Sequence, residues 1–215
     1  MELLQRTYEY ILQGGWVMIP LAVASVVLWT LMLERMTALR RLSRQDLAIE
    51  DAIHVVRGGA GDVRGDGLRA ELVRRFLSER SGLPDLDVSI LKQCTMEKRR
   101  ALGRSLPMIG ILVAVAPLLG LLGTVLGMIE TFQVISLFGT GNASAMANGI
   151  SVALITTESG LLIAVPGLFL SGILLQQSSR LRTQLEEDAT ILTRVVRRSA
   201  LSSHDRRRFD RVRGD

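Results

Sequence analysis

Three long stretches of the chain carry almost no charge. Residues 10–33 contain no Asp, Glu, Lys or Arg, and between Ser105 and Ser179 the only charged residues are Glu130 and Glu158. A transmembrane helix needs about 20 mostly apolar residues in succession. The pattern therefore predicts three membrane-spanning helices, at residues 14–33, 106–131 and 147–175. The alternative, buried helices of a soluble protein, is disfavoured by the length of these charge-free stretches.

The segments outside the predicted spans have helical periodicity. A helix is expected to continue from the first span through residues 34–57, until the sequence GGAGDVRGDG interrupts it. A second helix is expected at residues 68–80, and a third runs from about residue 87 into the second span. Residues 176–198 extend the third span as an amphipathic helix, and the basic tail after them is expected to be disordered. The predicted fold is an all-α integral membrane protein with three transmembrane helices and long cytoplasmic helical extensions.

Basic residues are distributed unevenly among the connecting segments. Residues 1–13 hold only Arg6, residues 34–105 hold 15 Lys and Arg, residues 132–146 hold none, and residues 176–215 hold 10. Because basic residues mark the cytoplasmic side of a membrane, residues 34–105 and 176–215 are predicted to be cytoplasmic. Residues 1–13 and the short loop 132–146 then lie on the opposite side. Topology and anionic lipid account for the net charge of +5, and nucleic acid is not expected as a partner.

Residue types typical of enzyme sites are sparse. Cys94 is the single cysteine, so no intramolecular disulfide is expected, and His54 and His204 show no metal-ligand spacing. The sequence contains no nucleophile elbow, phosphate-binding loop or paired-cysteine site. We therefore expect no enzymatic activity, no metal and no cofactor.

Small residues recur at helical spacing in the second and third spans. In the third span they lie three or four residues apart, which places them on one face of a helix: Gly149, Ala153, Thr157, Gly160, Ala164, Gly167 and Ser171. The second span has a matching series: Ala116, Gly120, Gly123, Thr124, Gly127 and Thr131. Small residues allow another helix to approach closely. The pattern fits packing of the two spans within one subunit and packing that also builds an oligomer, and it does not separate the two.

The sequences APLLGLLGTVLGMIETF at residues 116–132 and NGISVALITTESGLLIAVPGLF at residues 148–169 resemble the MotA/TolQ/ExbB proton-channel family, in particular its ExbB branch. The resemblance extends over essentially residues 10–200. MotA-like stators fit less well, because they usually have four spans and a larger cytoplasmic loop.

The resemblance implies a pentamer in a bacterial inner membrane, with a periplasmic N-terminus and a cytoplasmic C-terminus. Such a pentamer encloses the single transmembrane helices of an ExbD-like partner, whose aspartate carries the proton. Proton flow then drives a TonB-like protein that reaches the outer membrane. The family's pore threonines match Thr124 and Thr157. Many members also have a glutamate five residues before the second threonine, where this chain has Val152.

Glu158 lies about 145° around the third span from the small residues, at roughly 100° per residue. It shares this side with Asn148, Ser151 and Ser159, which predicts a polar half-channel that ends at Glu158. An ionised carboxylate at mid-membrane costs at least about 2.5–3.5 kcal/mol. Two interpretations remain open: a proton-exchanging or pore-lining group, and a neutral carboxyl group that is hydrogen-bonded between helices, for example to Ser25 or Thr30.

The leading interpretation is a subunit of a proton-driven motor that energises TonB-dependent transport across the outer membrane. A TolQ-like role in envelope maintenance is one alternative, and a non-conducting membrane scaffold for a single-span partner is another. A metabolite transporter is disfavoured, because the three spans contain no internal repeat.

The charge distribution generates a test of topology. A reporter fused after Arg75 or Arg198 should be active in the cytoplasm, and one inserted near Asn142 should be active in the periplasm, because basic loops remain on the cytoplasmic side. A periplasmic signal from the Arg75 fusion would contradict the predicted orientation.

Overall fold

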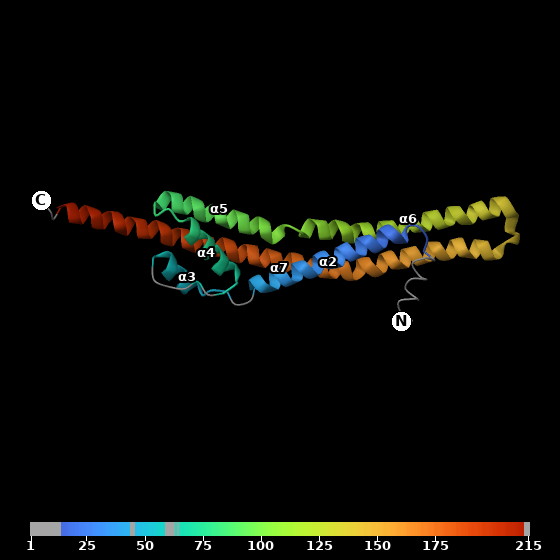
Figure 1. Ribbon diagram of the computed structural model, residues 1–215, viewed down its shortest axis with the longest axis horizontal. Coiled ribbons are helices and arrows are strands. Elements are labelled where there is room, and N and C mark those ends of the chain that lie inside the picture. The colour runs from blue at the N-terminus through green and yellow to red at the C-terminus, as the bar shows by residue number, and fades with distance from the viewer. Residues whose placement is uncertain (1–13, 44–45, 59–62, 64, 213–215) are drawn as a thin grey trace. The chain divides into compact units, whose positions relative to one another are not determined.

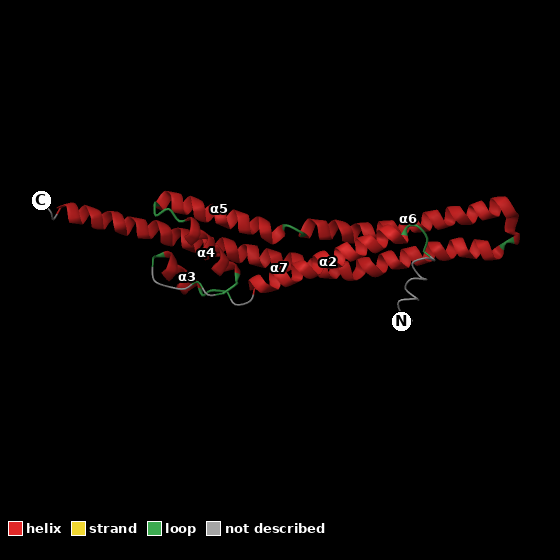
Figure 2. Ribbon diagram, viewed as in Figure 1, coloured by secondary structure: helices red, strands yellow, loops and turns green. Residues whose placement is uncertain are grey.

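The computed structural model describes residues 14–43, 46–58, 63 and 65–212, and side chains up to residue 198. Figure 1 shows the helices in chain order: α2 (Met18–Ser43), α3 (Ile49–Val56), α4 (Leu68–Glu79), α5 (Pro84–Gly103), α6 (Leu106–Phe138), a short 3-10 helix (Gly139–Gly141) and α7 (Ala143–Val212). The described residues contain no strand (Figure 2). Three helical stretches, in α2, α6 and α7, are long and apolar enough to cross a membrane. The predicted all-α fold with three apolar spans is thus confirmed.

The helix that was predicted to continue from the first span to residue 57 is interrupted. α2 ends at Ser43 and α3 begins at Ile49. In the break, the Asp46 carboxylate accepts hydrogen bonds from the backbone N–H groups of Arg69 (2.9 Å) and Ala70 (3.3 Å), at the start of α4. The N-cap residue of α4 is Gly67, which has no side chain to supply this cap. The prediction was wrong because the apolar periodicity of residues 34–57 contains no information about the hydrogen bonds that Asp46 makes to α4.

A second break separates α5 from α6, which were predicted to form one helix. α5 ends at Gly103 and α6 begins at Leu106. Pro107 lies in the first turn of α6 and has no N–H group. In a continuous helix its ring would clash with the carbonyl of Gly103, four positions earlier. The proline therefore ends one helix and begins the next.

α7 extends further than predicted, to Val212. The tail after residue 198 was expected to be disordered, but residues 199–212 contain neither Gly nor Pro. Once a helix is formed, each added residue gains a hydrogen bond without a new nucleation step. The amphipathic helix therefore continues into the basic tail.

The described chain divides into two compact units, and the first contains the charge-free segments. It comprises residues up to Arg35 together with Ser105–Ile173. In this unit α2 runs parallel to α7, because Gly15 lies beside Val152 and Leu28 lies beside Gly167. α6 runs antiparallel to α7, because Gly127 lies beside Gly149 and Gly120 beside Gly160. The chain direction alternates among the three helices, as three successive membrane crossings require.

Most apolar side chains of this unit are not covered by the chain itself. Within the most apolar window of each candidate span, only 22–28% of the residues are buried. The small core consists of Met18, Leu21, Ala116 and Ala164. Large side chains such as Leu118, Leu161 and Phe169 are exposed, and an apolar surface of this extent indicates contact with lipid or with other protein chains.

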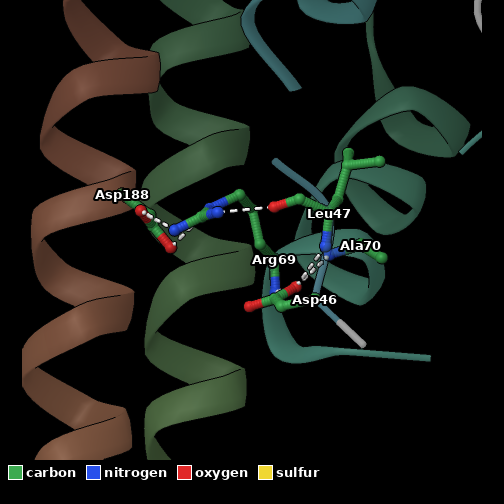
Figure 3. A network of polar contacts seen from close by, with 5 residues as sticks. All are labelled: Asp46, Leu47, Arg69, Ala70 and Asp188. Atoms are coloured by element: carbon green, nitrogen blue, oxygen red, sulfur yellow. Dashed lines mark hydrogen bonds and ion pairs between the residues drawn. The ribbon is translucent and has the colours of Figure 1, made fainter. Parts of the chain in front are cut away.

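The second unit comprises residues 36–104 and 174–215. Figure 3 shows the polar contacts that join α4 to α7: the Arg69 guanidinium donates two hydrogen bonds of 2.9 Å to the Asp188 carboxylate and a third to the Leu47 carbonyl. The Asp188 side chain is 9% exposed. A buried carboxylate is costly unless it is paired in this way. Arg69 therefore links the α3–α4 segment to the long helix α7.

Candidate functional site

The glycines of α6 and α7 bring the two backbones into direct contact. A Cβ atom added to Gly120 would lie 3.0 Å from the Thr156 carbonyl oxygen, and one added to Gly160 would lie 2.8 Å from the Ala116 carbonyl oxygen. Both distances are shorter than ordinary van der Waals contacts. No side chain larger than hydrogen fits at either position without separation of the helices.

The contact continues along α6 toward the loop that joins the helices. A Cβ atom on Gly127 would lie 2.6 Å from the Gly149 carbonyl oxygen and 3.0 Å from the Ala153 Cβ atom. One on Gly149 would lie 2.8 Å from the Gly127 carbonyl oxygen and would also overlap the Thr131 hydroxyl. The small residues of the two spans therefore face each other within one subunit. We call this contact the seam, and its residues are Ala116, Gly120, Gly123 and Gly127 of α6 and Gly149, Ala153, Gly160 and Ala164 of α7.

The other end of this seam is covered by α2. Ala116 and Ala164 are 1% and 2% exposed, and they pack with Met18 and Leu21 of α2. A Cβ atom on Gly167 would lie 3.0 Å from Val113 on α6 and 3.5 Å from Leu28 on α2. Gly167 thus lies where three helices meet.

Four threonines lie on or beside the seam, and they fall into two pairs. Thr131 and Thr156 are buried, and their hydroxyls donate to carbonyls of their own helices. Thr124 and Thr157, the two residues predicted to line a pore, are only half-buried. The Thr124 hydroxyl donates to the Leu121 carbonyl at 2.7 Å, and the Thr157 hydroxyl lies 3.2 Å from the Ala153 carbonyl and 3.4 Å from the Gly120 carbonyl of α6.

Thr156 is the residue beside the seam that sequence reasoning missed. It is 0% exposed, and its side chain fills the space beside Gly123, where an added Cβ atom would lie 2.7 Å from Thr156 Cγ2. The signal was present in the sequence, because Thr156 lies three residues after Ala153 and four before Gly160. Thr157 fits the same spacing, so the periodicity alone could not distinguish the two threonines.

Glu158 is exposed on α7, as are Asn148 and Ser151. Ile155, which lies among these polar residues in the sequence pattern, is buried. The Thr30 hydroxyl, considered as a partner for Glu158, donates to the Val26 carbonyl of its own helix at 2.7 Å. Val152, at the position where many family members have a glutamate, lies beside Gly15 before α2.

The described residues offer little support for other chemistry. No group of three or more His, Cys, Asp and Glu side chains among them is arranged to hold a metal ion. The Cys94 thiol is buried in the second unit, and desolvation, followed by the nearby carboxylates Glu79 and Glu97, raises its pKa. A thiol with a raised pKa stays protonated at neutral pH and is a poor nucleophile.

Comparison with known proteins identifies the family. Residues 65–187 match the MotA/TolQ/ExbB proton channel family. The chain belongs to this family. The match spans both helices of the small-residue seam, so the family assignment covers the segment in which the threonine pair lies.

Several ExbB proteins are similar to this chain over most of their length. The chain is 32% identical to the putative biopolymer transport protein ExbB-like 1 of a Synechocystis species, over 81% of this chain and 73% of the relative. It is 31% identical to the biopolymer transport protein exbB1 of Vibrio cholerae, over 86% of this chain and 85% of the relative. The ExbB protein of Salmonella typhimurium is 29% identical over 80% of this chain.

The seam geometry predicts which glycines tolerate a methyl group. Gly127→Ala and Gly160→Ala should each lower the stability of the protein by about 1–3 kcal/mol, because the added carbon forces the two backbones apart. Gly110→Ala and Gly172→Ala are matched controls on the same two helices, since a Cβ atom at either position meets nothing within 4 Å. Thermal unfolding in mild detergent measures all four. Equal stability of the seam and control variants would contradict the described contact.

Proposed function

We propose that this chain is an ExbB-like subunit of a proton-driven motor in a bacterial inner membrane, which energises TonB-dependent transport across the outer membrane. Membership in a proton channel family supports this function, and so do relatives named biopolymer transport proteins. In the proposed arrangement the N-terminus is periplasmic and residues 34–105 and 176–215 are cytoplasmic. The partners are an ExbD-like single-span protein with an intramembrane aspartate and a TonB-like protein.

The proposed motor is a closed homo-oligomer, by analogy with the family a pentamer. The exposed apolar side chains of α2, α6 and α7 support this assembly, because they exceed what one subunit covers. The glycine seam is occupied within the subunit, so the contacts between subunits are assigned to these larger side chains. If native mass spectrometry in mild detergent finds the protein to be a monomer, this result would contradict the proposed motor.

The observation that carries the proposal is the approach of the half-buried Thr157 hydroxyl to the Gly120 carbonyl of α6, the helix that also carries Thr124. The Gly120 carbonyl, which lies 3.4 Å from the Thr157 hydroxyl, is four residues before Thr124 on α6. Four residues correspond to about 6 Å along a helix and to nearly the same face. The two half-buried hydroxyls therefore lie at similar depth, at the edge of the seam.

The hydrogen-bonding state of these hydroxyls suits contact with a proton-carrying acid. A threonine hydroxyl has one hydrogen to donate and two lone pairs to accept. In both residues helix carbonyls accept the hydrogen, so the oxygen lone pairs can accept a hydrogen bond from a protonated carboxyl group. In the proposed mechanism the two oxygens hold the partner's protonated aspartate until it releases its proton on the other side.

Replacement of both threonines tests this mechanism. The double variant Thr124→Val/Thr157→Val keeps volume and β-branching and removes both oxygens. Assembly with the partner should persist, because the seam glycines are unchanged, and energy-dependent uptake in cells should fall at least about tenfold if each lost hydrogen bond is worth about 1 kcal/mol. Oligomer amount is measured in parallel.

Thr30→Val is the matched control. Thr30 lies in the α2 span, and its hydroxyl donates to a carbonyl of its own helix like that of Thr124. This variant should retain uptake. Full uptake by the Thr124→Val/Thr157→Val variant would eliminate the mechanism and leave both threonines as packing residues.

Glu158 is proposed to act as a neutral, hydrogen-bonding group rather than a proton carrier. Its side chain is exposed on α7, about 100° around the helix from Thr157, and the charge-free stretch around it contains no cation. An ionised carboxylate at mid-membrane costs at least about 2.5–3.5 kcal/mol. On this account its side chain needs the capacity for hydrogen bonding and not for ionisation.

Conservative substitutions distinguish the two roles of Glu158. Glu158→Gln is nearly isosteric and stays polar, so assembly and most uptake activity should be retained. Glu158→Leu should weaken assembly by about 1–3 kcal/mol where it leaves a bonding partner unsatisfied. If Glu158→Gln assembles normally but abolishes uptake while Glu158→Asp keeps part of it, Glu158 exchanges protons and the neutral role is wrong.

A further inference from the structure

A pocket lined by three arginines lies in the second unit, between α5 and α7. Its volume is about 360 Å³, and it is lined by Met96, Arg99 and Arg100 of α5 and by Arg182 of α7. Ser178 of α7 joins the two helices beside the pocket, because its buried hydroxyl donates to the Leu102 carbonyl of α5 at 2.9 Å. This hydrogen bond holds together the two helices that carry the arginines.

The charge of this pocket is only partly compensated. The Arg99 guanidinium pairs with the Glu186 carboxylate at 3.3 Å. Among the described residues, neither Arg100 nor Arg182 forms an ion pair. The Nε atom of Arg182 is buried and has no acceptor among them. Adjacent guanidinium groups repel each other unless an anion lies between them, so the pocket is suited to an anion.

Gly103 makes room for the Arg182 side chain. A Cβ atom on Gly103 would overlap the Arg182 guanidinium, which supplies the three nearest atoms. The guanidinium therefore lies against the last residue of α5, which has no side chain. In this position Arg182 lines the same pocket as Arg100.

The pocket lies close in sequence to the end of the predicted third span. Arg182 follows residue 175, the end of the predicted third span, by seven residues on the continuous helix α7. At 1.5 Å per residue this is about 10 Å along the helix. The polar headgroup layer adds about 5–8 Å on each side of the hydrocarbon core, and a long arginine side chain near a helix end can reach back to the membrane surface, so Arg182 lies within reach of lipid phosphates.

We propose that this pocket binds the phosphate group of an anionic phospholipid. Guanidinium groups bind phosphate oxygens through paired hydrogen bonds, and basic pockets between membrane helices are suited to anionic headgroups. The phosphate accepts from the terminal NH2 groups of Arg182 and Arg100, which line the pocket, and neutralises both charges. A free phosphate ion has the same binding chemistry, but the membrane supplies lipid phosphate at this depth. The proposal does not depend on the proton-driven function.

Native mass spectrometry of the full-length protein tests the proposal, with phosphatidylglycerol and phosphatidylcholine titrated separately. Phosphatidylglycerol should bind more tightly. Arg100→Gln/Arg182→Gln should weaken its binding roughly 25-fold, at about 1 kcal/mol for each basic residue near an anionic surface. The control Arg197→Gln/Arg198→Gln removes the same charge from exposed positions further along α7, and it should weaken binding less than about threefold.

Gly103→Ala provides a test without any change of charge. It displaces the Arg182 guanidinium and should weaken phosphatidylglycerol binding, whereas Gly172→Ala, which meets nothing within 4 Å, should not. Equal binding of the two lipids, equal losses in both arginine variants, or unchanged binding in Gly103→Ala would each overturn the proposal. Displacement of the lipid by excess inorganic phosphate, with the same variants weakening phosphate binding, would assign the pocket to a soluble anion instead.

Discussion

Direct contact between the backbones of α6 and α7 is the constraint on which the membrane part of this protein depends. Gly120, Gly127, Gly149 and Gly160 each lie so close to the facing helix that an added Cβ atom would come within 3.0 Å of a backbone carbonyl oxygen. Lipid tails are as apolar as leucine, so helices in a membrane gain little from burying apolar surface. Close packing and hydrogen bonds must hold them together, and the absence of side chains at these positions makes both available.

This contact determines what the rest of the unit presents to its surroundings. The small residues lie in the contact between α6 and α7, and the large apolar side chains lie on the outside of the three helices. It also fixes the position of Thr157, whose hydroxyl lies near a carbonyl of α6, relative to Thr124. The polar edge of the seam, formed by Thr124 and Thr157, and the apolar exterior therefore both follow from one packing arrangement. In the proposed motor the polar edge meets the partner helix, and the apolar exterior meets lipid and neighbouring subunits.

Features that depend on composition along the chain could be predicted from the sequence. The absence of charge in residues 105–129 and 131–157 was enough to predict long apolar helices in this part of the chain, because length and apolarity decide whether a helix can span a membrane. The small-residue spacing predicted one packing face on each helix, since helix geometry alone relates residues three and four apart. In the structure the glycines of these faces lie against the opposite helix. Thr156 was missed because two adjacent threonines fit the same spacing.

Features that depend on contacts between distant segments could not be predicted. The cap that Asp46 supplies to α4 joins residues that are 23 or 24 positions apart, and no local pattern distinguishes that aspartate from others. The same holds for the Arg69–Asp188 pair and for Arg182 beside Gly103. Each requires knowledge of which helix faces which, and that emerges only from the folded chain.

The central claim, that the seam closes within one subunit, is tested most directly by cysteine cross-linking. Gly167 of α7 lies beside Val113 of α6, and a Cβ atom added to Gly167 would meet side-chain atoms only. Val113→Cys/Gly167→Cys in a Cys94→Ser background should therefore form a disulfide in membranes under mild oxidation. A protease site inserted between Gly139 and Asn142 separates the two helices after cleavage. We expect the oxidised fragments to remain joined and the uncut chain to migrate as a monomer on a denaturing gel. A disulfide-linked dimer, with fragments that separate after cleavage, would show that the seam joins different subunits and would contradict this account.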